Sequence, residues 1–361
     1  MSKSLKRVHI DGANIAALTA AARLSKFKYE VTISGDIYQN TVIDGYSFDN
    51  GALFTLPAVY RDFFQKTGKH FGQVLDVKAM DPAFVFDFGD IQINFANLSR
   101  NARLAEIEAK LGKVAAEEWD ALLKQGEYFW DRIRENYVEW EFSILRFDLN
   151  TYMRMRTPYV QNPYLLKILS HYATYLGYPA GLYKWSHILA FIEESFGIWQ
   201  VNGGIGALTS AIKERAAELG TKFEANNNYD FYIDATQEHS APEQRLIGIN
   251  NFPEKLPVRT VIFNKSGLTT DIYAQELASG KFSLVITGPL ETLRFGKFIE
   301  VDQIRPAIQG DSDDQLLTNI RTANKRRFKV RHADSLSHAG ITGELLANAV
   351  RGIKNRPSHE H

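Results

Sequence analysis

The N-terminal segment alternates between strand and helix patterns, and this order constrains the fold more than any other feature of the sequence. Residues 8–10 form a short apolar strand, residues 11–14 a turn, and an alanine-rich helix extends to about Leu24. A second strand pattern follows over residues 29–33. Strand, helix and strand in this order form a βαβ unit, in which the two strands lie parallel. We therefore expect an α/β protein that begins with a unit of the dinucleotide-binding type.

The turn of this unit departs from the usual glycine pattern. Three glycines normally bend the chain, admit the pyrophosphate and let the helix pack closely against the strand. Gly12, Asn14 and Ala17 stand at these positions, and the Asn14 side chain projects toward the place where a diphosphate meets the helix N-terminus. Asp11 adds a repulsion of roughly 3 kcal/mol if it lies about 6 Å from a phosphate at an effective dielectric constant of about 20. The turn alone therefore also fits a fold that binds no nucleotide.

The acid that binds the adenosine ribose is displaced by one position. It normally ends the second strand, about 20 residues past the glycine motif. Here residues 31–34 are followed by Gly35, and Asp36 comes next. Asp36 can take this role if the strand end shifts by one residue; otherwise the ribose hydroxyls have no acceptor at this position.

Periodic patterns predict further elements along the chain. Residues 57–67 fit a helix, and residues 84–95 fit a hairpin. Residues 103–140 fit helices with an apolar stripe and with breaks at Gly112 and Gly126, as in a layer that packs on the body of the protein. Strands are predicted over residues 197–201, 229–234, 245–249, 258–264 and 282–287, and a closing strand, turn and helix over residues 328–353.

Three blocks of sequence resemble one family, and they occur in the family's order. Residues 6–34 with residues 44–62 (DGYSFDNGALFTLPAVYRD) are similar to the N-terminal part of the bacterial phytoene desaturases. Residues 196–208 (FGIWQVNGGIGAL) resemble the later strand, Gly-Gly turn and helix of that family. Residues 332–343 (HADSLSHAGITG) resemble the closing flavin motif shared with amine oxidases and protoporphyrinogen oxidases. With the aromatic segment from Asn162 onward, the blocks cover about half of the chain, so the chain resembles a shortened member of the phytoene desaturase and flavin-containing amine oxidase superfamily.

The resemblance implies a fold and a division into domains. The fold would be α/β, with a Rossmann-like FAD/NAD(P)-binding domain of the glutathione-reductase type and an inserted α+β substrate domain. The dinucleotide-binding domain would be discontinuous, comprising residues 1–75, 196–240 and 296–361. The substrate or cap domain would comprise residues 76–195 and 241–295.

The resemblance also implies FAD as the cofactor. Gly12 and Ala17 would face the pyrophosphate, and Asp334 would hydrogen-bond the ribityl-phosphate linkage. Residues 340–343 would open a helix whose positive end meets the flavin pyrimidine ring. The predicted cofactor-binding residues are Gly12, Ala13, Asn14, Ala17, Asp36, Asp334, Gly340, Ile341 and Gly343.

Several features depart from the family. Between the second strand and Gly45, the family carries an Arg-rich segment with paired glycines that wraps the pyrophosphate. Residues 36–44 are shorter and lack both features. Ala333 stands where the closing motif has a glycine, which is a mild change. The chain is also shorter than typical desaturases, chiefly after Gly220, so the substrate domain is trimmed.

Candidate catalytic groups are few, because the flavin of such enzymes carries the hydride and the protein orients the substrate. We therefore assign no catalytic residue. Histidines and carboxylates show no metal-binding spacing, so we expect no metal site. Aromatic residues after Asn162 fit either a tunnel for a hydrophobic substrate or an ordinary core. The predicted substrate-contacting residues are Tyr172, Tyr175, Tyr183, Trp185, Gly203 and Gly204.

Composition excludes several classes of protein. The chain has no cysteine, which excludes disulfides, thiolate nucleophiles and iron–sulfur clusters held by cysteine. Its 42 basic and 42 acidic residues balance, so no overall field attracts nucleic acid. No apolar run approaches the 18 residues of a membrane span. We expect a cytoplasmic protein, with peripheral contact with the inner face of a membrane as an alternative. The candidate contact residues are Trp119, Phe129, Trp130 and Trp140.

Two functions are compatible with these features. The first is an FAD-dependent oxidoreductase of the desaturase or oxidase type, which passes hydride from a small hydrophobic substrate, carotenoid-like or amine, to flavin N5. The second is a flavin-free relative that acts as a binding or scaffold protein, as some Rab-regulating proteins do. Asp11, Asn14, Gly35 and the short segment 36–44 favour the second, and Asp334 with the closing glycines favours the first. The sequence gives neither the substrate, nor the electron acceptor, nor the oligomeric state.

Overall fold

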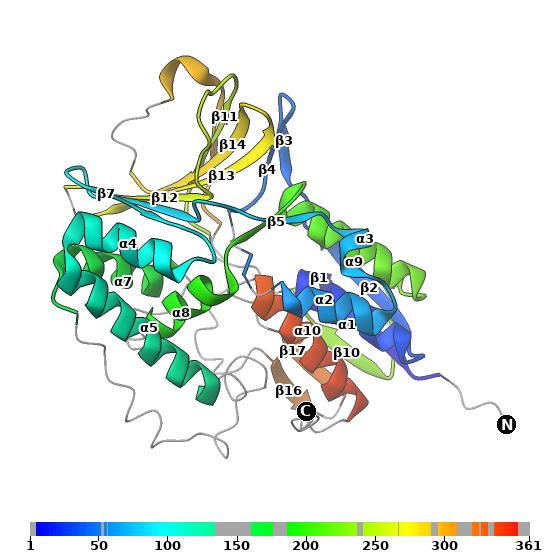
Figure 1. The fold of residues 1–361 in the computed structure, drawn as a ribbon. Helices are drawn as coiled ribbons and strands as arrows, with labels where there is room; N and C mark the ends of the chain where they lie inside the picture. Colours follow the sequence, from blue (N-terminus) through cyan, green and yellow to red (C-terminus); the bar gives the residue numbers. More distant parts are fainter. Residues whose placement is uncertain are drawn as a thin grey trace.

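The chain folds into two lobes, each built on one large sheet (Figure 1). One lobe carries the N-terminal strand and the C-terminal helix, and the other carries the remaining large sheet with a group of helices at one end. The computed structural model describes residues 5–51, 54–55, 57–133, 160–175, 186–236, 241–265, 267–289, 295–308, 320–324, 326–330 and 336–352.

The first sheet contains six strands among the described residues, in the order β16-β17-β10-β1-β2-β9. β1 pairs in parallel with β2 and with β10, and β10 pairs in parallel with β17. Parallel neighbours joined by helical crossovers are the Rossmann-type arrangement, so the predicted fold class is confirmed. The strands are β1 (Arg7–Ala13), β2 (Glu30–Ile37), β9 (Lys222–Phe223), β10 (Phe231–Asp234), β16 (Ile320–Asn324) and β17 (Arg327–Val330).

Helix α1 (Ile15–Lys26) is buried almost all round, because its alanines let neighbouring helices approach closely. It packs against α9 (Gly204–Glu218) and α10 (Leu336–Arg351), and α2 (Ala58–Thr67) packs against α1 and α10. The short helix α3 (Phe71–Val74) follows α2. The predicted helix over residues 57–67 and the closing helix are thus confirmed.

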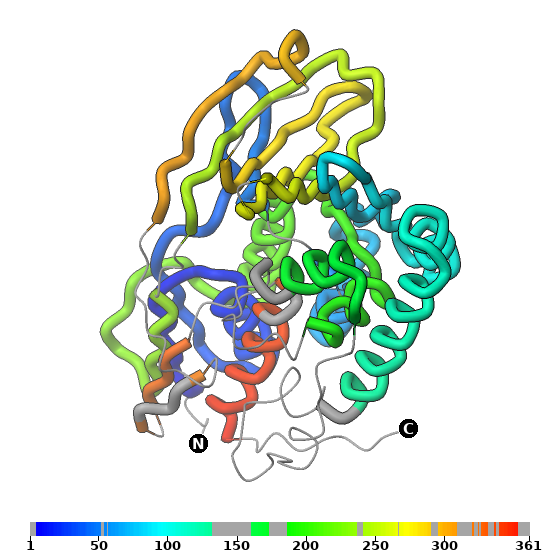
Figure 2. Tube along the Cα trace, turned by 90° about the vertical axis from the view of Figure 1, so that its left-hand side faces the viewer, coloured from blue at the N-terminus to red at the C-terminus, as the bar shows by residue number. Residues whose placement is uncertain are grey.

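The second sheet contains seven strands of the described chain, in the order β15-β11-β14-β13-β12-β6-β7. Its pairs are antiparallel except for β6 with β12. The helices α4, α5, α7 and α8 lie together at the β7 end of this sheet (Figures 1 and 2). The bounds are β6 (Phe84–Asp87), β7 (Gln92–Phe95), α4 (Arg100–Leu111), α5 (Lys113–Ile133), α7 (Pro163–Tyr175), α8 (Ser186–Phe196), β11 (Gln244–Ile249), β12 (Arg259–Phe263), β13 (Thr269–Ala278), β14 (Lys281–Thr287), η4 (Gly296–Phe298) and β15 (Ile299–Arg305).

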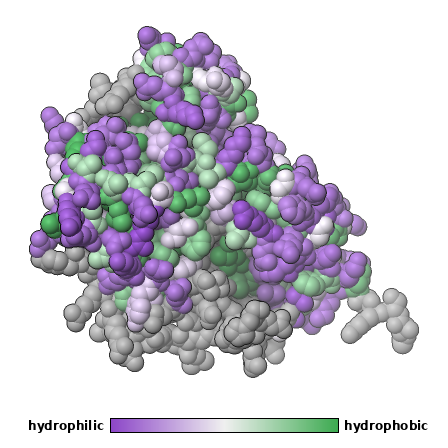
Figure 3. Space-filling model, viewed as in Figure 1, coloured by the Kyte–Doolittle hydropathy of each residue, from purple (hydrophilic) through white to green (hydrophobic). Residues whose placement is uncertain are grey.

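Two small sheets lie between the lobes. β3 (Thr41–Ile43) and β4 (Tyr46–Phe48) form a hairpin, and β4 packs against β14 of the second sheet. β5 (Val77–Ala79) pairs with β8 (Trp199–Val201), which leads into α9. On the face shown in Figure 3, hydrophilic residues cover the lobes and hydrophobic residues gather near the centre, where the lobes meet.

The structure differs from the sequence predictions at two places, β15 and Gly126. Ile299–Arg305 (β15) pairs with β11 in the second sheet, although the predicted boundary at residue 296 assigned it to the dinucleotide-binding domain. Gly112 does end α4, but Gly126 lies inside α5. A Cβ at Gly126 would lie 2.4 Å from the His187 carbonyl oxygen, so this glycine allows α5 and α8 to touch rather than breaking a helix.

The proposed membrane-contact aromatics are part of the core. Trp119, Phe129 and Trp130 are at most 4% exposed, because the apolar stripe of α5 faces α8 and the second sheet. They therefore do not form a membrane-facing surface, and Trp140 lies outside the described residues. Within the described part of the chain, no helix has the length and apolar character needed to cross a bilayer.

Candidate functional site

The turn between β1 and α1 is closed by backbone from β10. Gly12 has a φ of +96°, a conformation that favours glycine. A Cβ at Gly12 would lie 2.2 Å from the Ala235 carbonyl oxygen, and the Ala235 amide donates to the Asp11 carbonyl oxygen at 2.7 Å. The glycine at the first motif position is therefore required by packing of the protein on itself, whether or not a nucleotide binds. Ala13 ends β1 in the core, 4% exposed.

Asn14 occupies the N-terminus of α1 with both ends of its side-chain amide. Its Oδ1 accepts from the Ala17 amide at 3.0 Å, as an N-cap residue does. Its Nδ2 donates to the Ala235 carbonyl oxygen at 3.1 Å. The helix end that binds a diphosphate in dinucleotide folds thus already holds a side chain of the protein.

Asp11 places a carboxylate at the carboxyl end of β1. Its Oδ1 accepts from the Ser34 hydroxyl at 2.9 Å, and its Oδ2 accepts from the Tyr232 hydroxyl at 3.2 Å. Burial and the neighbouring Asp11 raise the pKa of Tyr232 to about 12. Ligands of open α/β sheets bind at this edge, so the charge stands where a phosphate would need to approach.

β2 continues past the point where the sequence predicted its end. The pairing of β1 with β2 shifts register between Asp11 and Ala13, and Ala13 then pairs with Ile37. Gly35, at a φ of +102°, lies against the turn, since a Cβ there would be 3.1 Å from the Gly12 Cα. Asp36 is exposed on this extension. The extended strand therefore covers Gly12, and the ribose-binding role of Asp36 stays a prediction.

The glycines of the closing motif serve helix packing in this structure. A Cβ at Gly340 would lie 2.7 Å from Val59 Cγ1 on α2, and one at Gly343 would lie 2.5 Å from the Ala16 carbonyl oxygen on α1. Ile341, between them, is half-buried. Asp334 lies outside the described residues, so its predicted role is neither confirmed nor contradicted.

The N-terminus of α9 is occupied by side chains from a distant segment. Gly203 caps the helix at a φ of +83°, and Gly204 follows at +69°. The Gly206 amide donates to Asn40 Oδ1 at 2.9 Å, across 166 positions of sequence. Asn40 Nδ2 donates to the Gly203 carbonyl oxygen at 2.8 Å. The carboxylate of Asp49 also reaches this end, because a Cβ at Gly204 would lie 2.9 Å from its Oδ2.

Asp49 is a buried carboxyl group between the two lobes. It is 1% exposed, and it accepts from the Gly51 amide at 2.8 Å and from the Tyr273 hydroxyl of β13 at 3.4 Å. Burial raises the pKa of Asp49 to about 6, against the lowering effects of the Gly51 and Ile205 amides. Arg305 of β15 donates to the Asp49 carbonyl oxygen at 3.0 Å. The segment around Asp49, which is part of the block that resembles the family, therefore links the two lobes.

The predicted substrate aromatics are only partly within the described chain. Tyr172 is 1% exposed and packs against Phe84 in the second core, with ring centroids 6.1 Å apart. The Tyr175 side chain, Tyr183 and Trp185 lie outside what the structure describes. Contact of these residues with a substrate stays a prediction.

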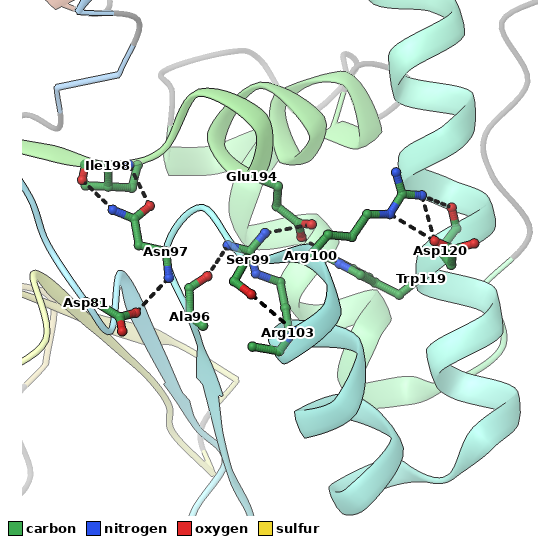
Figure 4. Close-up of polar contacts among 11 residues, drawn as sticks. Asp81, Ala96, Asn97, Ser99, Arg100, Arg103, Trp119, Asp120, Glu194 and Ile198 are labelled. Carbon is green, nitrogen blue, oxygen red and sulfur yellow. Dashed lines mark hydrogen bonds and ion pairs between the residues drawn. The ribbon is translucent and has the colours of Figure 1, made fainter.

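A buried charged cluster beside Tyr172 was not predicted from the sequence. Arg103 pairs with Glu194 at 2.6 Å, both nearly fully buried, and Trp119 Nε1 donates to Glu194 at 2.7 Å (Figure 4). Burial raises the pKa of the adjacent Glu193 to about 8. The available signal was two consecutive acids directly after the apolar run at residues 188–192 of helix α8. The pair joins α4, α5 and α8, and breaking one partner of such a pair destabilises strongly.

Comparison with curated proteins finds carotenoid enzymes. The chain is 23% identical over 248 residues to a 4,4'-diapolycopene oxygenase of Methylomonas sp., covering 61% of this chain and 49% of that protein. It is 24% identical over 243 residues to a 4,4'-diapophytoene desaturase of Staphylococcus haemolyticus, covering 61% and 48%. The chain spans about half the length of the curated relatives it matches. No model of a known protein family matches the chain.

Comparison with solved structures finds amine oxidases. A putrescine oxidase superposes with a TM-score of 0.60 at 12% identity, covering 96% of this chain and 99% of that one. The predicted resemblance is confirmed. The cyclohexylamine oxidase of Brevibacterium oxydans gives 0.58 at 8% identity, covering 97% and 99%, and a RAB GDI of Plasmodium falciparum gives 0.51 at 11%, covering 98% and 100%. At the level of the family, the relatives are oxidoreductases of the FAD type, and the structural likeness shows the fold.

The superfamily makes FAD the expected cofactor, but the described residues at the β1–α1 turn do not fit its diphosphate. The Asn14 amide holds the helix end, the Asp11 carboxylate stands at the strand end, and Gly35 covers Gly12. The segment that wraps the pyrophosphate in the family is replaced here by one whose Asn40 binds α9. The protein's own groups therefore occupy the position that the cofactor would take.

Proposed function

We propose that this chain is a flavin-free member of the phytoene desaturase and amine oxidase superfamily that acts as a binding protein. The observation that carries the proposal is Asn14, which caps α1 and bonds to Ala235 at the place of the diphosphate. Seating a diphosphate requires breaking both bonds, and loss of such a cap alone costs about 1 kcal/mol. Asp11 opposes the phosphate in addition. The structural likeness to a RAB GDI supports the proposal, since a fold by itself does not specify redox chemistry.

The test is flavin binding by the purified protein. We expect a colourless protein whose titration with FAD, followed by flavin fluorescence and calorimetry, gives no saturable binding. The variant Asn14→Gly with Asp11→Gly should gain measurable affinity, because it frees the helix end and removes the repelling charge. Protein that purifies with the absorbance bands of bound flavin would overturn the proposal.

A matched control separates the turn from a general effect of losing a cap. Asn162 caps α7 in the other lobe, where its Oδ1 accepts from the Tyr164 and Leu165 amides. Asn162→Gly should leave FAD affinity unchanged while removing a comparable cap. Equal gains in both variants would mean that loosened folding, rather than an opened turn, admits the flavin.

A second candidate is an FAD-dependent oxidoreductase acting on a small hydrophobic substrate, carotenoid-like or an amine. The names of the similar proteins support it, and so does the close packing of Gly343 on α1, which keeps the closing helix against the first. The same titration decides between the two candidates. Saturable FAD binding by the unaltered chain favours the oxidoreductase, and steady-state assays with carotenoid precursors and amines would then identify the substrate class.

A further inference from the structure

A groove of about 1150 Å³ opens on the first lobe, between α2, α3 and the β5–β8 sheet. Figure 1 shows α3 next to β5, and none of the groove residues belongs to the β1–α1 turn. Its volume slightly exceeds the range of about 300–1,000 Å³ that is typical of small-molecule sites. The residues that define its chemistry are Arg61, Lys69, His70, Phe71, Leu75 and Trp199.

The floor of the groove is apolar. Phe71 and Leu75 are 9% and 7% exposed, and they belong to the first core. Trp199 is half-buried, and its Nε1 donates to the Phe196 carbonyl oxygen at 2.7 Å, which fixes the orientation of the indole ring. The polar edge of the indole is thus satisfied, so the ring contributes apolar surface to the groove.

The rim of the groove is basic. Arg61, Lys69 and His70 are exposed along it, and Asp76 is an acid among the lining residues. The Arg61 guanidinium lies 5.9 Å from the centre of the Trp199 ring. Lys69 pairs with Glu218 at 3.0 Å, whereas Arg61 makes no ion pair within the described part of the chain. An arginine held over an aromatic face, with its charge unpaired, is suited to bind a carboxylate or a phosphate.

We propose that this groove binds a single-chain amphiphile with an anionic head. The apolar chain lies on Phe71, Leu75 and Trp199, and the carboxylate or phosphate head lies beside Arg61. Burial of the chain removes apolar surface from water, which favours binding, and Arg61 selects the sign of the head. The groove lies apart from the β1–α1 turn, so this proposal goes beyond the proposed function and does not depend on it.

The test uses dodecyl phosphate below its micelle concentration, with calorimetry on the full chain. We expect saturable binding of one molecule, and binding at least tenfold weaker for inorganic phosphate and for dodecyltrimethylammonium. Equal binding of either comparison ligand would overturn the proposal, since the first lacks the chain and the second reverses the charge. Binding only to vesicles containing phosphatidic acid, with none to the monomer, would also overturn it, because the groove would then serve a membrane surface.

Variants locate the site. Arg61→Gln should weaken dodecyl phosphate at least tenfold, and Lys110→Gln, which removes an exposed charge on α4, should leave affinity unchanged. Circular dichroism verifies that both variants fold. The Asn14→Gly with Asp11→Gly variant should bind dodecyl phosphate as the unaltered chain does, so failure here is distinguishable from failure of the flavin proposal. Unchanged affinity in Arg61→Gln would refute the assignment.

Discussion

The backbone amides at the N-termini of α1 and α9 find their hydrogen-bond acceptors in different ways. α1 is capped locally, by the Asn14 that begins it. α9 has only a glycine at its cap, and its amides are bound by Asn40 and by the buried carboxyl group of Asp49, from a segment more than 150 positions earlier in the sequence. Both helix ends are places where α/β proteins bind anions, and both are filled by the protein itself. The α1 cap therefore serves one helix, whereas the α9 cap also joins the two lobes.

Among substitutions at the two helix ends, removal of the Asp49 side chain should lower the free energy of unfolding most. Asp49→Ala leaves the Gly51 amide and the Tyr273 hydroxyl without their acceptor in a buried place, so we expect a loss of about 3 kcal/mol in the free energy of unfolding at pH 5. Urea denaturation measures it. Asp49→Asn keeps an acceptor of the same shape and should cost less than about 1 kcal/mol. Equal losses in both variants would contradict a role for the Asp49 side chain as the acceptor of these two bonds.

Stability should depend on pH through Asp49. Its pKa rises from 3.8 to about 6 on folding, so the folded state holds the proton more tightly than the unfolded state. The contribution is complete below pH about 4 and is lost as pH rises through about 6, amounting to about 3 kcal/mol at most. Denaturation curves between pH 4 and 8 measure it.

Glu193 titrates in an overlapping pH range, so its contribution to the pH dependence has to be separated from that of Asp49. Its pKa rises from 4.5 to about 8, so the double variant Asp49→Asn with Glu193→Gln should show a flatter profile than either single variant. If Asp49→Asn leaves the dependence of stability on pH unchanged, Asp49 does not contribute to it.

Asn40→Ala should lower the free energy of unfolding by an intermediate amount. The substitution removes the acceptor of the Gly206 amide and the donor to the Gly203 carbonyl oxygen, for an expected loss of about 2 kcal/mol. The second observable is hydrogen exchange, because the amides of the first turn of α9 should exchange faster while those of α1 stay unchanged. Equal acceleration at both helices would mean global unfolding rather than loss of one cap.

Asn14→Ala should have the smallest effect, about 1 kcal/mol, since it removes one local cap and one bond to Ala235. Asn14→Asp keeps the acceptor for the Ala17 amide and loses the donor to Ala235, so it divides the two contributions. Thermal denaturation measures both. A loss greater than that of Asn40→Ala would reverse the ranking of the two helix ends.

The sequence predicted what depends on neighbouring residues. The βαβ start, the hairpin over residues 84–95 and the helix over residues 57–67 follow from local periodicity, and Asn14 was identified because its position in the motif is local. The clamp of Asn40 and Asp49 on α9 could not be predicted, since nothing within either segment specifies a partner more than 150 positions away. The same limit applies to β15, whose place in the second sheet depends on β11.

Glycines show most clearly that a local pattern does not identify a distant contact. Gly12 was expected for the turn, and its positive φ and contact with Ala235 agree with that. Gly126 was read as a helix break, but its role depends on the carbonyl of His187 on another helix. The spacing of Gly340 and Gly343 resembled a cofactor motif, and in the structure each meets a different helix. A missing side chain signals a close approach, but only the fold shows what approaches.

The hairpin of β3 and β4 has a mechanical consequence. Asn40 and Asp49 flank it and hold α9, while Lys281 and Arg305 of the second sheet donate to Gly45 and Asp49. Rotation of one lobe against the other would have to break these bonds together, so the hinge closure by which many two-lobed enzymes enclose a substrate is opposed. A ligand that needs the lobes to rotate would therefore have to supply the free energy of these bonds.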